Sequence, residues 1–195
     1  MPGEHAAPRG RPRSPEVDLA IRRAVVGLLQ EHGYPELSIE GVAIRAGVAK
    51  TTIYRRFPSK GVLVAHALFD TATDAVPVPD TGTLRDDLVA MMRTLIALVR
   101  HDYWSRAIPA LAAEATDDPR LDELVRGFTR VRLEMVEPLF DRAVARGEVR
   151  PGVDRELVGD LLVGAVHHRR FISRRPLDDQ LADRAVDLVL RAISA

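Results

Sequence analysis

Residues 47–60 read GVAKTTIYRRFPSK and contain the only two lysines of the chain, Lys50 and Lys60. No acidic residue occurs between positions 41 and 69. The formal net charge of the chain is zero, yet residues 1–60 hold ten lysines and arginines against six acids, whereas the remainder holds 18 against 22. Such an asymmetry indicates that the amino-terminal end meets a polyanion. A solvated basic surface would produce the same count, so the local pattern has to decide between the two.

The composition excludes several classes of protein. The chain has no cysteine, which excludes disulfides, thiolate catalysis and cysteine-ligated metals. It contains no phosphate-binding loop, dinucleotide fingerprint or G-x-S-x-G motif, so we expect no enzyme activity, no catalytic residue, no metal and no cofactor. The amino terminus lacks an apolar signal stretch, and no apolar run approaches the ~18 residues of a membrane-spanning helix. We therefore expect a cytoplasmic protein with no membrane partner.

Apolar residues recur at helical spacing and no segment alternates with the period of a strand, which predicts an all-α protein. Residues 1–14 are rich in proline, glycine and arginine and are predicted to form a disordered basic arm. Pro15 begins the first helix and Gly33 ends it. Ser38 caps a short second helix that Gly47 breaks. Further helices are predicted at 51–57, from Ser59 to a loop at 76–82, and at about 83–100, 103–115, 119–146, 154–172 and 178–193.

The residues around Gly47 have the pattern of a helix-turn-helix. This motif needs a small residue where its helices pack closely, a glycine in the turn and an apolar anchor on the second helix; Ala43, Gly47 and Ile53 meet these needs. The second helix directs hydrogen-bond donors of modest bulk outward, as binding in a major groove requires. These outward residues are Lys50, Thr51, Thr52, Tyr54 and Arg55. Single-stranded RNA is a weaker alternative because only Tyr54 and Phe57 are available for base stacking.

Residues 15–64, with IEGVAIRAGVAKTTIYRRFPSKGVLV at their centre, resemble the DNA-binding region of the tetracycline-repressor (TetR) family of bacterial regulators. The resemblance lies in AGV (46–48), T-x-Y (52–54), the ring of Phe57 and PSK (58–60) at the start of the next helix. It implies phosphate contacts for Ser38 and Lys60, contacts with base edges or nearby phosphates for Lys50, Thr51 and Thr52, and contacts with backbone and base for Tyr54.

Four arginines add predicted contacts with double-stranded DNA. Arg55 and Arg56 are predicted to neutralise phosphates, with a solvated helix face as the alternative. The arm sequence RGRPR (9–13) resembles arms whose arginines enter a narrow minor groove, so Arg11 and Arg13 are predicted contacts there. The alternative for the arm is an inert tail.

Three positions depart from the pattern of the family. Ala49 stands where a serine or threonine usually caps the reading helix, Arg56 replaces a common histidine, and Gly61 replaces a common acidic residue. These departures leave the predicted fold intact, but they prevent prediction of the base sequence that is read.

Residues 83–195 resemble the helical ligand-binding and dimerisation half of the same family, which implies an apolar pocket among the helices at 83–146. The large apolar residues predicted to line it are Met91, Met92, Leu95, Trp104, Phe128 and Met135. Helical spacing alone does not separate such a lining from ordinary core. The segments 157–166 and 181–193, including Val166 and Val189, are predicted to form a four-helix bundle with a second copy; the alternative is that they close the monomer.

We therefore predict a basic arm at 1–14, a helix-turn-helix DNA-binding domain at 15–60, and a ligand-binding and dimerisation domain at 61–195. The predicted function is that of a dimeric transcriptional repressor that binds a palindromic duplex operator. A small apolar or amphiphilic effector is predicted to release it. The alternative is a DNA-binding regulator without a small-molecule effector.

Overall fold

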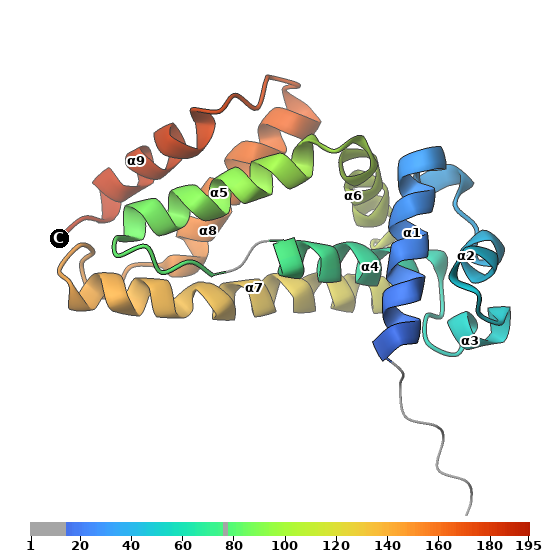
Figure 1. Ribbon diagram of the computed structural model, residues 1–195. Coiled ribbons are helices and arrows are strands. Elements are labelled where there is room, and N and C mark those ends of the chain that lie inside the picture. Colours follow the sequence, from blue (N-terminus) through green and yellow to red (C-terminus); the bar gives the residue numbers. More distant parts are fainter. Residues whose placement is uncertain (1–14, 76–77) are drawn as a thin grey trace, which may run out of the picture.

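The computed structural model describes residues 15–75 and 78–195, which form an all-α structure, as predicted. The helices in chain order are α1 (Pro15–Glu36), α2 (Ile39–Ala46), α3 (Lys50–Tyr54), α4 (Lys60–Ala75), α5 (Leu84–Arg100), α6 (Asp102–Glu114), α7 (Pro119–Ala145), α8 (Arg155–His167), the π-helical turn η1 (His168–Ile172) and α9 (Leu181–Ile193). In Figure 1, α1, α2 and α3 gather at one end of the molecule, and α7 runs along the larger remaining body.

Helix α1 connects the small group of helices to the larger body. Its apolar residues recur on one face, and Ile21, Val25 and Leu29 on that face are buried. Gly33 interrupts the regular helix with a φ of 77°, a left-handed conformation that glycine adopts easily, and a last turn continues to Glu36. Because α1 packs against α2, α4 and α6, it belongs to both parts of the structure.

The helix-turn-helix forms through local signals that the sequence displays. The Ser38 hydroxyl oxygen accepts a hydrogen bond of 3.1 Å from a first-turn N–H of α2, and Gly47 ends α2 with a φ of 66°. Ile53 is fully buried and anchors α3 in the core. Ala49 supplies no side-chain cap, and α3 has five residues, so the regular helix ends earlier than the predicted 51–57.

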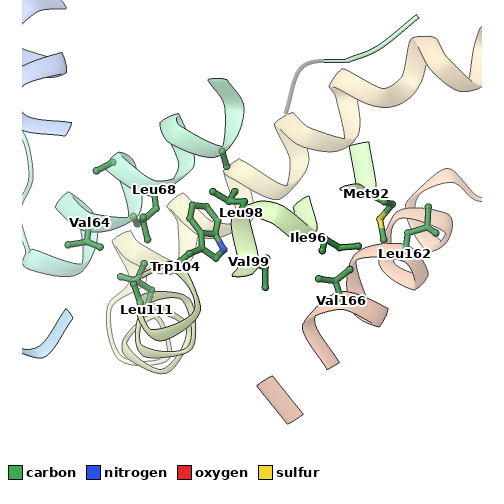
Figure 2. Close-up of a cluster of buried hydrophobic side chains, with 14 of the residues drawn as sticks. Val64, Leu68, Met92, Ile96, Leu98, Val99, Trp104, Leu111, Leu162 and Val166 are labelled. Atoms are coloured by element: carbon green, nitrogen blue, oxygen red, sulfur yellow. The ribbon is translucent and has the colours of Figure 1, made fainter. Parts of the chain in front are cut away.

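A continuous hydrophobic core extends from the helix-turn-helix into the larger body. Figure 2 shows Trp104 of α6 beside Leu68 of α4 and Leu98 of α5, with Met92 and Leu162 at the other end of the cluster. Helix α4 packs against α1, α6 and α7. Within the described ranges, no helix combines the length and apolarity that crossing a bilayer requires.

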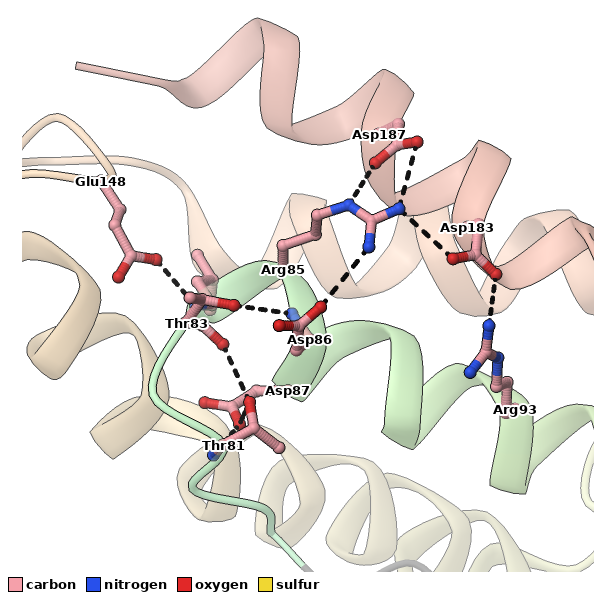
Figure 3. A network of polar contacts seen from close by, with 10 residues as sticks. Thr81, Thr83, Arg85, Asp86, Asp87, Arg93, Glu148, Asp183 and Asp187 are labelled. Carbon is pink, nitrogen blue, oxygen red and sulfur yellow. Dashed lines mark hydrogen bonds and ion pairs between the residues drawn. The ribbon is translucent and has the colours of Figure 1, made fainter.

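Polar contacts fix the beginning of α5 between its neighbours (Figure 3). Asp87 is fully buried, and one of its carboxylate oxygens accepts hydrogen bonds of 2.7 Å from both the N–H and the O–H of Thr81. On the outer side of α5, Arg85 forms ion pairs with Asp187 at 2.8 Å and Asp183 at 3.3 Å, both on α9. The first turn of α5 therefore holds both the loop that precedes it and α9.

Candidate DNA-binding face and ligand cavity

The predicted reading residues lie on the exposed side of α3. Lys50, Thr51, Tyr54 and Arg55 are exposed, and Thr52 is partly exposed. The Lys50 ammonium lies 5.4 Å from the ring centroid of Tyr54, one turn along the helix. The structure thus presents together the donors that the sequence assigned to a major groove, and their contacts with DNA remain predictions.

Acidic side chains from α1 and α2 form ion pairs with three of the basic residues between positions 45 and 56. Arg45 forms two hydrogen bonds of 2.6 and 2.5 Å with the carboxylate of Glu31, Lys50 forms an ion pair with Glu40, and Arg56 forms one with Asp18. The hydrogen bond from Lys50 lowers the pKa of the Glu40 carboxyl, and the one from Arg45 lowers the pKa of Glu31. Residues 41–69 contain no acid, but the folded surface around them does, because α1 and the start of α2 contribute acidic side chains there.

These pairs affect one of the two phosphate contacts predicted for Arg55 and Arg56. The side chain of Arg56 is only 15% exposed in its pair with Asp18, so a phosphate contact would require that pair to open. Arg55, by contrast, is exposed and forms no ion pair with any residue of the described chain. Arg11 and Arg13 lie outside the described residues.

Two predicted phosphate contacts mark the starts of helices. Ser38 is exposed at the first turn of α2. Lys60, at the start of α4, donates a hydrogen bond of 3.1 Å to the carbonyl oxygen of Pro35, and its ammonium lies 4.4 Å from the centroid of the Tyr34 ring. This cation–π contact holds Lys60 close to the end of α1.

Sequence reasoning missed two residues of α2 beside the reading helix. Glu40 pairs with Lys50, and Ile44, one turn further along α2, is 83% exposed. A large exposed aliphatic residue can contact a thymine methyl group. The helical pattern assigned only Val42 and Ala43 to the buried side and gave no signal that distinguished the outward residues.

A largely apolar cavity of about 350 Å³ lies within the larger body. Five of the six predicted residues line it, namely Met91, Met92, Leu95, Trp104 and Phe128. Met135 does not line the cavity, because α7 turns it just beyond the stripe formed by Phe128, Arg132 and Val136. The cavity also extends beyond the predicted range 83–146, since α4 contributes Phe69 and α8 contributes Leu162. Phe69 and Phe128 stack with their ring centroids 4.1 Å apart.

Few polar side chains share this wall. Arg155 pairs with Glu137 and, at 2.7 Å, with Asp141, and the hydrogen bond that Arg155 donates to Asp141 raises the pKa of Arg155. Burial lowers the pKa of the Arg132 guanidinium and of the His167 imidazole. The cavity is therefore apolar with a small number of polar groups, the usual composition of a small-molecule site.

Helix α6 joins this cavity to the DNA-binding end. Trp104, Ile108 and Leu111 of α6 line the cavity, whereas Glu114 at its carboxyl end accepts a hydrogen bond from the Tyr34 hydroxyl of α1. The next residues supply a second contact, in which the Ser59 hydroxyl donates to the Asp118 carboxylate at 3.0 Å. Two polar bonds therefore connect the helix-turn-helix to α6 and α7.

Helices α8 and α9 leave apolar residues exposed. Leu157 and Leu161 on α8 are 52% and 56% exposed, and Leu188 on α9 is 67% exposed. Val166 and Val189, which belong to the segments predicted to pack against a second copy, are 0% and 9% exposed and belong to the core of the protomer. Because these helices are amphipathic, one face packs on α5 and the other carries the exposed leucines.

Comparison with known proteins gives the same assignment for both halves of the chain. Residues 21–67 match the family "Bacterial regulatory proteins, tetR family", and residues 78–189 match "Tetracyclin repressor-like, C-terminal domain". The DNA-binding transcriptional repressor TetR of Mycobacteroides abscessus is 35% identical over 93% of this chain and 94% of its own.

Comparison with solved structures gives the same family. The TetR family transcription regulator SCO0332 superposes with a TM-score of 0.80 and 32% identity, over 92% of this chain and 100% of that one. FadR from Bacillus subtilis in complex with stearoyl-CoA shares the fold with a TM-score of 0.63 at 17% identity, over 90% of this chain and 98% of that one. The protein described here is therefore a transcriptional regulator of the TetR family, with a DNA-binding domain, and is not an enzyme.

Proposed function

We propose that this regulator is a dimeric repressor that binds a palindromic duplex operator and leaves it when a small apolar or amphiphilic molecule occupies the cavity. One observation carries the proposal: α6 forms a wall of the cavity and, through Glu114, contacts α1 of the DNA-binding end. In this proposal residues 15–60 read DNA, and residues 61–195 bind the effector and the second copy.

The DNA-binding part of the proposal rests on α3 and its neighbours. A reading helix of five residues makes few base contacts, so two copies are needed for useful affinity. The exposed Leu161 of α8 and Leu188 of α9 provide an apolar face for the second copy. A two-fold dimer would bring its two reading helices to successive major grooves about 34–36 Å apart.

The effector part rests on the cavity. Its volume of about 350 Å³ and its apolar wall fit a small molecule, and a family member of the same fold, FadR, binds stearoyl-CoA. A ligand that fits only the conformation with wrongly spaced reading helices would shift the population toward it. The assignment as a repressor is supported by the name of the Mycobacteroides abscessus relative.

Two measurements test the proposal. Selection of bound duplexes from a random pool should return two inverted half-sites, and a single half-site or no consensus would contradict it. Any effector found by thermal-shift screening should then bind more weakly when operator is saturating. A coupling of about 1–3 kcal/mol corresponds to roughly 5–150-fold and must be equal in both directions. Equal effector affinity with and without operator would favour the alternative, a regulator without a small-molecule effector.

A further inference from the structure

Tyr34, near the end of α1, lies between a predicted DNA contact and the larger body of the molecule. Its side chain is buried, with 8% exposure. The ring lies against Lys60, whose ammonium is 4.4 Å from the ring centroid. The hydroxyl donates a hydrogen bond to the carboxylate of Glu114. One aromatic side chain therefore contacts the first residue of α4 and the last residue of α6.

The partners of Lys60 hold its ammonium without neutralising it. Among the described residues they are the Tyr34 ring and the carbonyl oxygen of Pro35, which accepts a hydrogen bond of 3.1 Å. Neither partner carries a charge, whereas Lys50 forms an ion pair with Glu40. A lysine side chain that is already held in place loses less rotamer freedom when it binds a phosphate. The contacts of Lys60 therefore prepare it for an anion and leave its full charge available.

We propose that Tyr34 is a positioning residue for DNA binding, whose ring places Lys60 for a phosphate and whose hydroxyl makes that placement depend on α6. The inference rests on the proposed function, because it takes Lys60 as a phosphate contact and α6 as a wall of the effector cavity. Trp104 and Leu111 of α6 line that cavity. A shift of α6 therefore moves Glu114 and, through the Tyr34 hydroxyl, the ring that holds Lys60.

The surroundings of the Tyr34 hydroxyl suit this link. Burial and the hydrogen bond to Glu114 raise the pKa of Tyr34, so the phenol stays protonated and remains a donor. Gly61, which follows Lys60, brings the start of α4 close to the same carboxylate, because a Cβ there would lie 2.8 Å from a Glu114 oxygen. The start of α4 and the end of α6 therefore meet beside Tyr34 with little space between them.

A double-mutant cycle tests the ring. Binding to a random duplex is measured by fluorescence anisotropy at a fixed salt concentration, because phosphate contacts do not require an operator. Tyr34→Leu removes the ring and should weaken binding roughly two- to fivefold, as the loss of one cation–π contact implies. Tyr34→Phe keeps the ring and should restore binding to nearly the parent level. In a Lys60→Ala background, the change Tyr34→Leu should have no further effect, because the lysine that the ring holds is absent.

Two results of this cycle would overturn the inference. Equal losses from Tyr34→Leu in the parent and in the Lys60→Ala background would show a general loosening of α1. Unchanged binding by Tyr34→Leu would show that the ring does not position Lys60. Where Tyr34→Leu folds poorly, Tyr34→Phe keeps the inference testable, because it removes one oxygen atom and leaves the packing of the ring in place.

The fluorescence of Trp104 tests the hydroxyl. Trp104 is the only tryptophan of the chain, is 5% exposed and lies in the cavity wall on α6. A saturating random duplex should shift its emission maximum in the parent, and the shift should largely disappear in Tyr34→Phe, which lacks the hydrogen bond to Glu114. Tyr103→Phe, which removes a hydroxyl from α6 itself, should retain the shift. No shift in the parent, or an equal shift in Tyr34→Phe, would overturn the link to α6.

These outcomes are separate from those of the proposed function. A random duplex requires neither a palindromic operator nor an effector, so the two tests of Tyr34 stand without either. A repressor that has an operator and an effector, but in which Tyr34→Leu and Tyr34→Phe behave like the parent, would support the proposed function and reject this inference.

Discussion

Lys50, the first residue of the reading helix, is paired with Glu40 of the preceding helix, so a predicted DNA contact is already neutralised in the free protein. A phosphate or a guanine edge must replace that carboxylate before Lys50 can contribute to binding. Random DNA offers only the phosphate, whereas the operator offers the phosphate and its matching bases. The Lys50–Glu40 pair therefore opposes nonspecific binding more than operator binding.

The first prediction concerns this pair. Glu40→Gln should raise affinity for random duplex DNA and steepen its salt dependence, by up to ~0.9 in log–log slope for the one phosphate contact released. The ratio of operator to random affinity should fall. Fluorescence anisotropy over a salt series measures both quantities, with Glu134→Gln on exposed α7 as the control of equal charge change. Identical changes in Glu40→Gln and Glu134→Gln would show a general charge effect instead.

A second prediction separates positioning from reading. Arg55→Ala should weaken binding to all duplexes alike and lower the salt slope by up to ~0.9, because Arg55 is exposed and paired with no acid of the described chain. Thr52→Ala should instead change the preference among bases by about 1–3 kcal/mol. Anisotropy with the selected operator, single-base variants and random DNA distinguishes the two, and equal losses on all of them for Thr52→Ala would exclude a reading role.

The third prediction concerns the exposed face of α8. Leu161→Asp should yield a folded monomer with poor operator affinity, because Leu161 is 56% exposed in the protomer and an aspartate there costs nothing until a second copy covers it. Ala113→Asp, at an exposed position of α6, should remain dimeric. Sedimentation velocity checks the mass of each. An aspartate at Val166 would test folding instead, because Val166 is fully buried.

A fourth prediction follows from burial of His167 in the cavity wall, which lowers its pKa from the ordinary value of 6.5. The folded state then favours the neutral imidazole, so its contribution to stability is present above that value and is lost as pH falls below it. Denaturant midpoints should fall between about pH 7.5 and pH 5.5, and His167→Gln should reduce the fall. His168→Gln, at the exposed neighbour, should leave it unchanged. The lowered pKa values of Glu31 and Glu40 act below 4.5, outside this window. An equal fall in His167→Gln and the parent would refute the prediction.

The local features of the fold were predictable because they depend on residues close together in the chain. Ser38 begins α2 and Gly47 ends it through contacts within one turn. Ile53 is buried within the same short motif. The acidic partners were not predictable, since Asp18 is 38 positions away from Arg56. The spacing of residues in the sequence shows which of them lie on one face of a helix, but it does not show which other helix will cover that face.

The cavity shows the same limit. Helical periodicity marks large apolar residues, but Met135 and Phe128 lie on nearly the same face of α7. The sequence does not show where the edge of the cavity falls on that face, and Met135 lies just beyond it. The same limit applies to the exposed face of α8. Val166 and Leu161 are both apolar and lie five positions apart on one amphipathic helix, but α8 directs the first into the core and the second outward.

Gly61 lets the start of α4 pack closely against Glu114 and Leu121 at the junction between the two parts of the molecule. A Cβ at this position would lie 2.8 Å from a carboxylate oxygen of Glu114 and 2.9 Å from Leu121, so the ends of both side chains would have to shift. An acidic residue at this position would also bring a second negative charge to Glu114, which already accepts the Tyr34 hydroxyl. In a hybrid regulator built by joining a relative's DNA-reading end to this larger body, a side chain at position 61 should therefore require Glu114 and Leu121 to move. The fit at this junction therefore depends on Gly61, Glu114 and Leu121 together, and none of these three residues is a predicted DNA contact or lines the cavity.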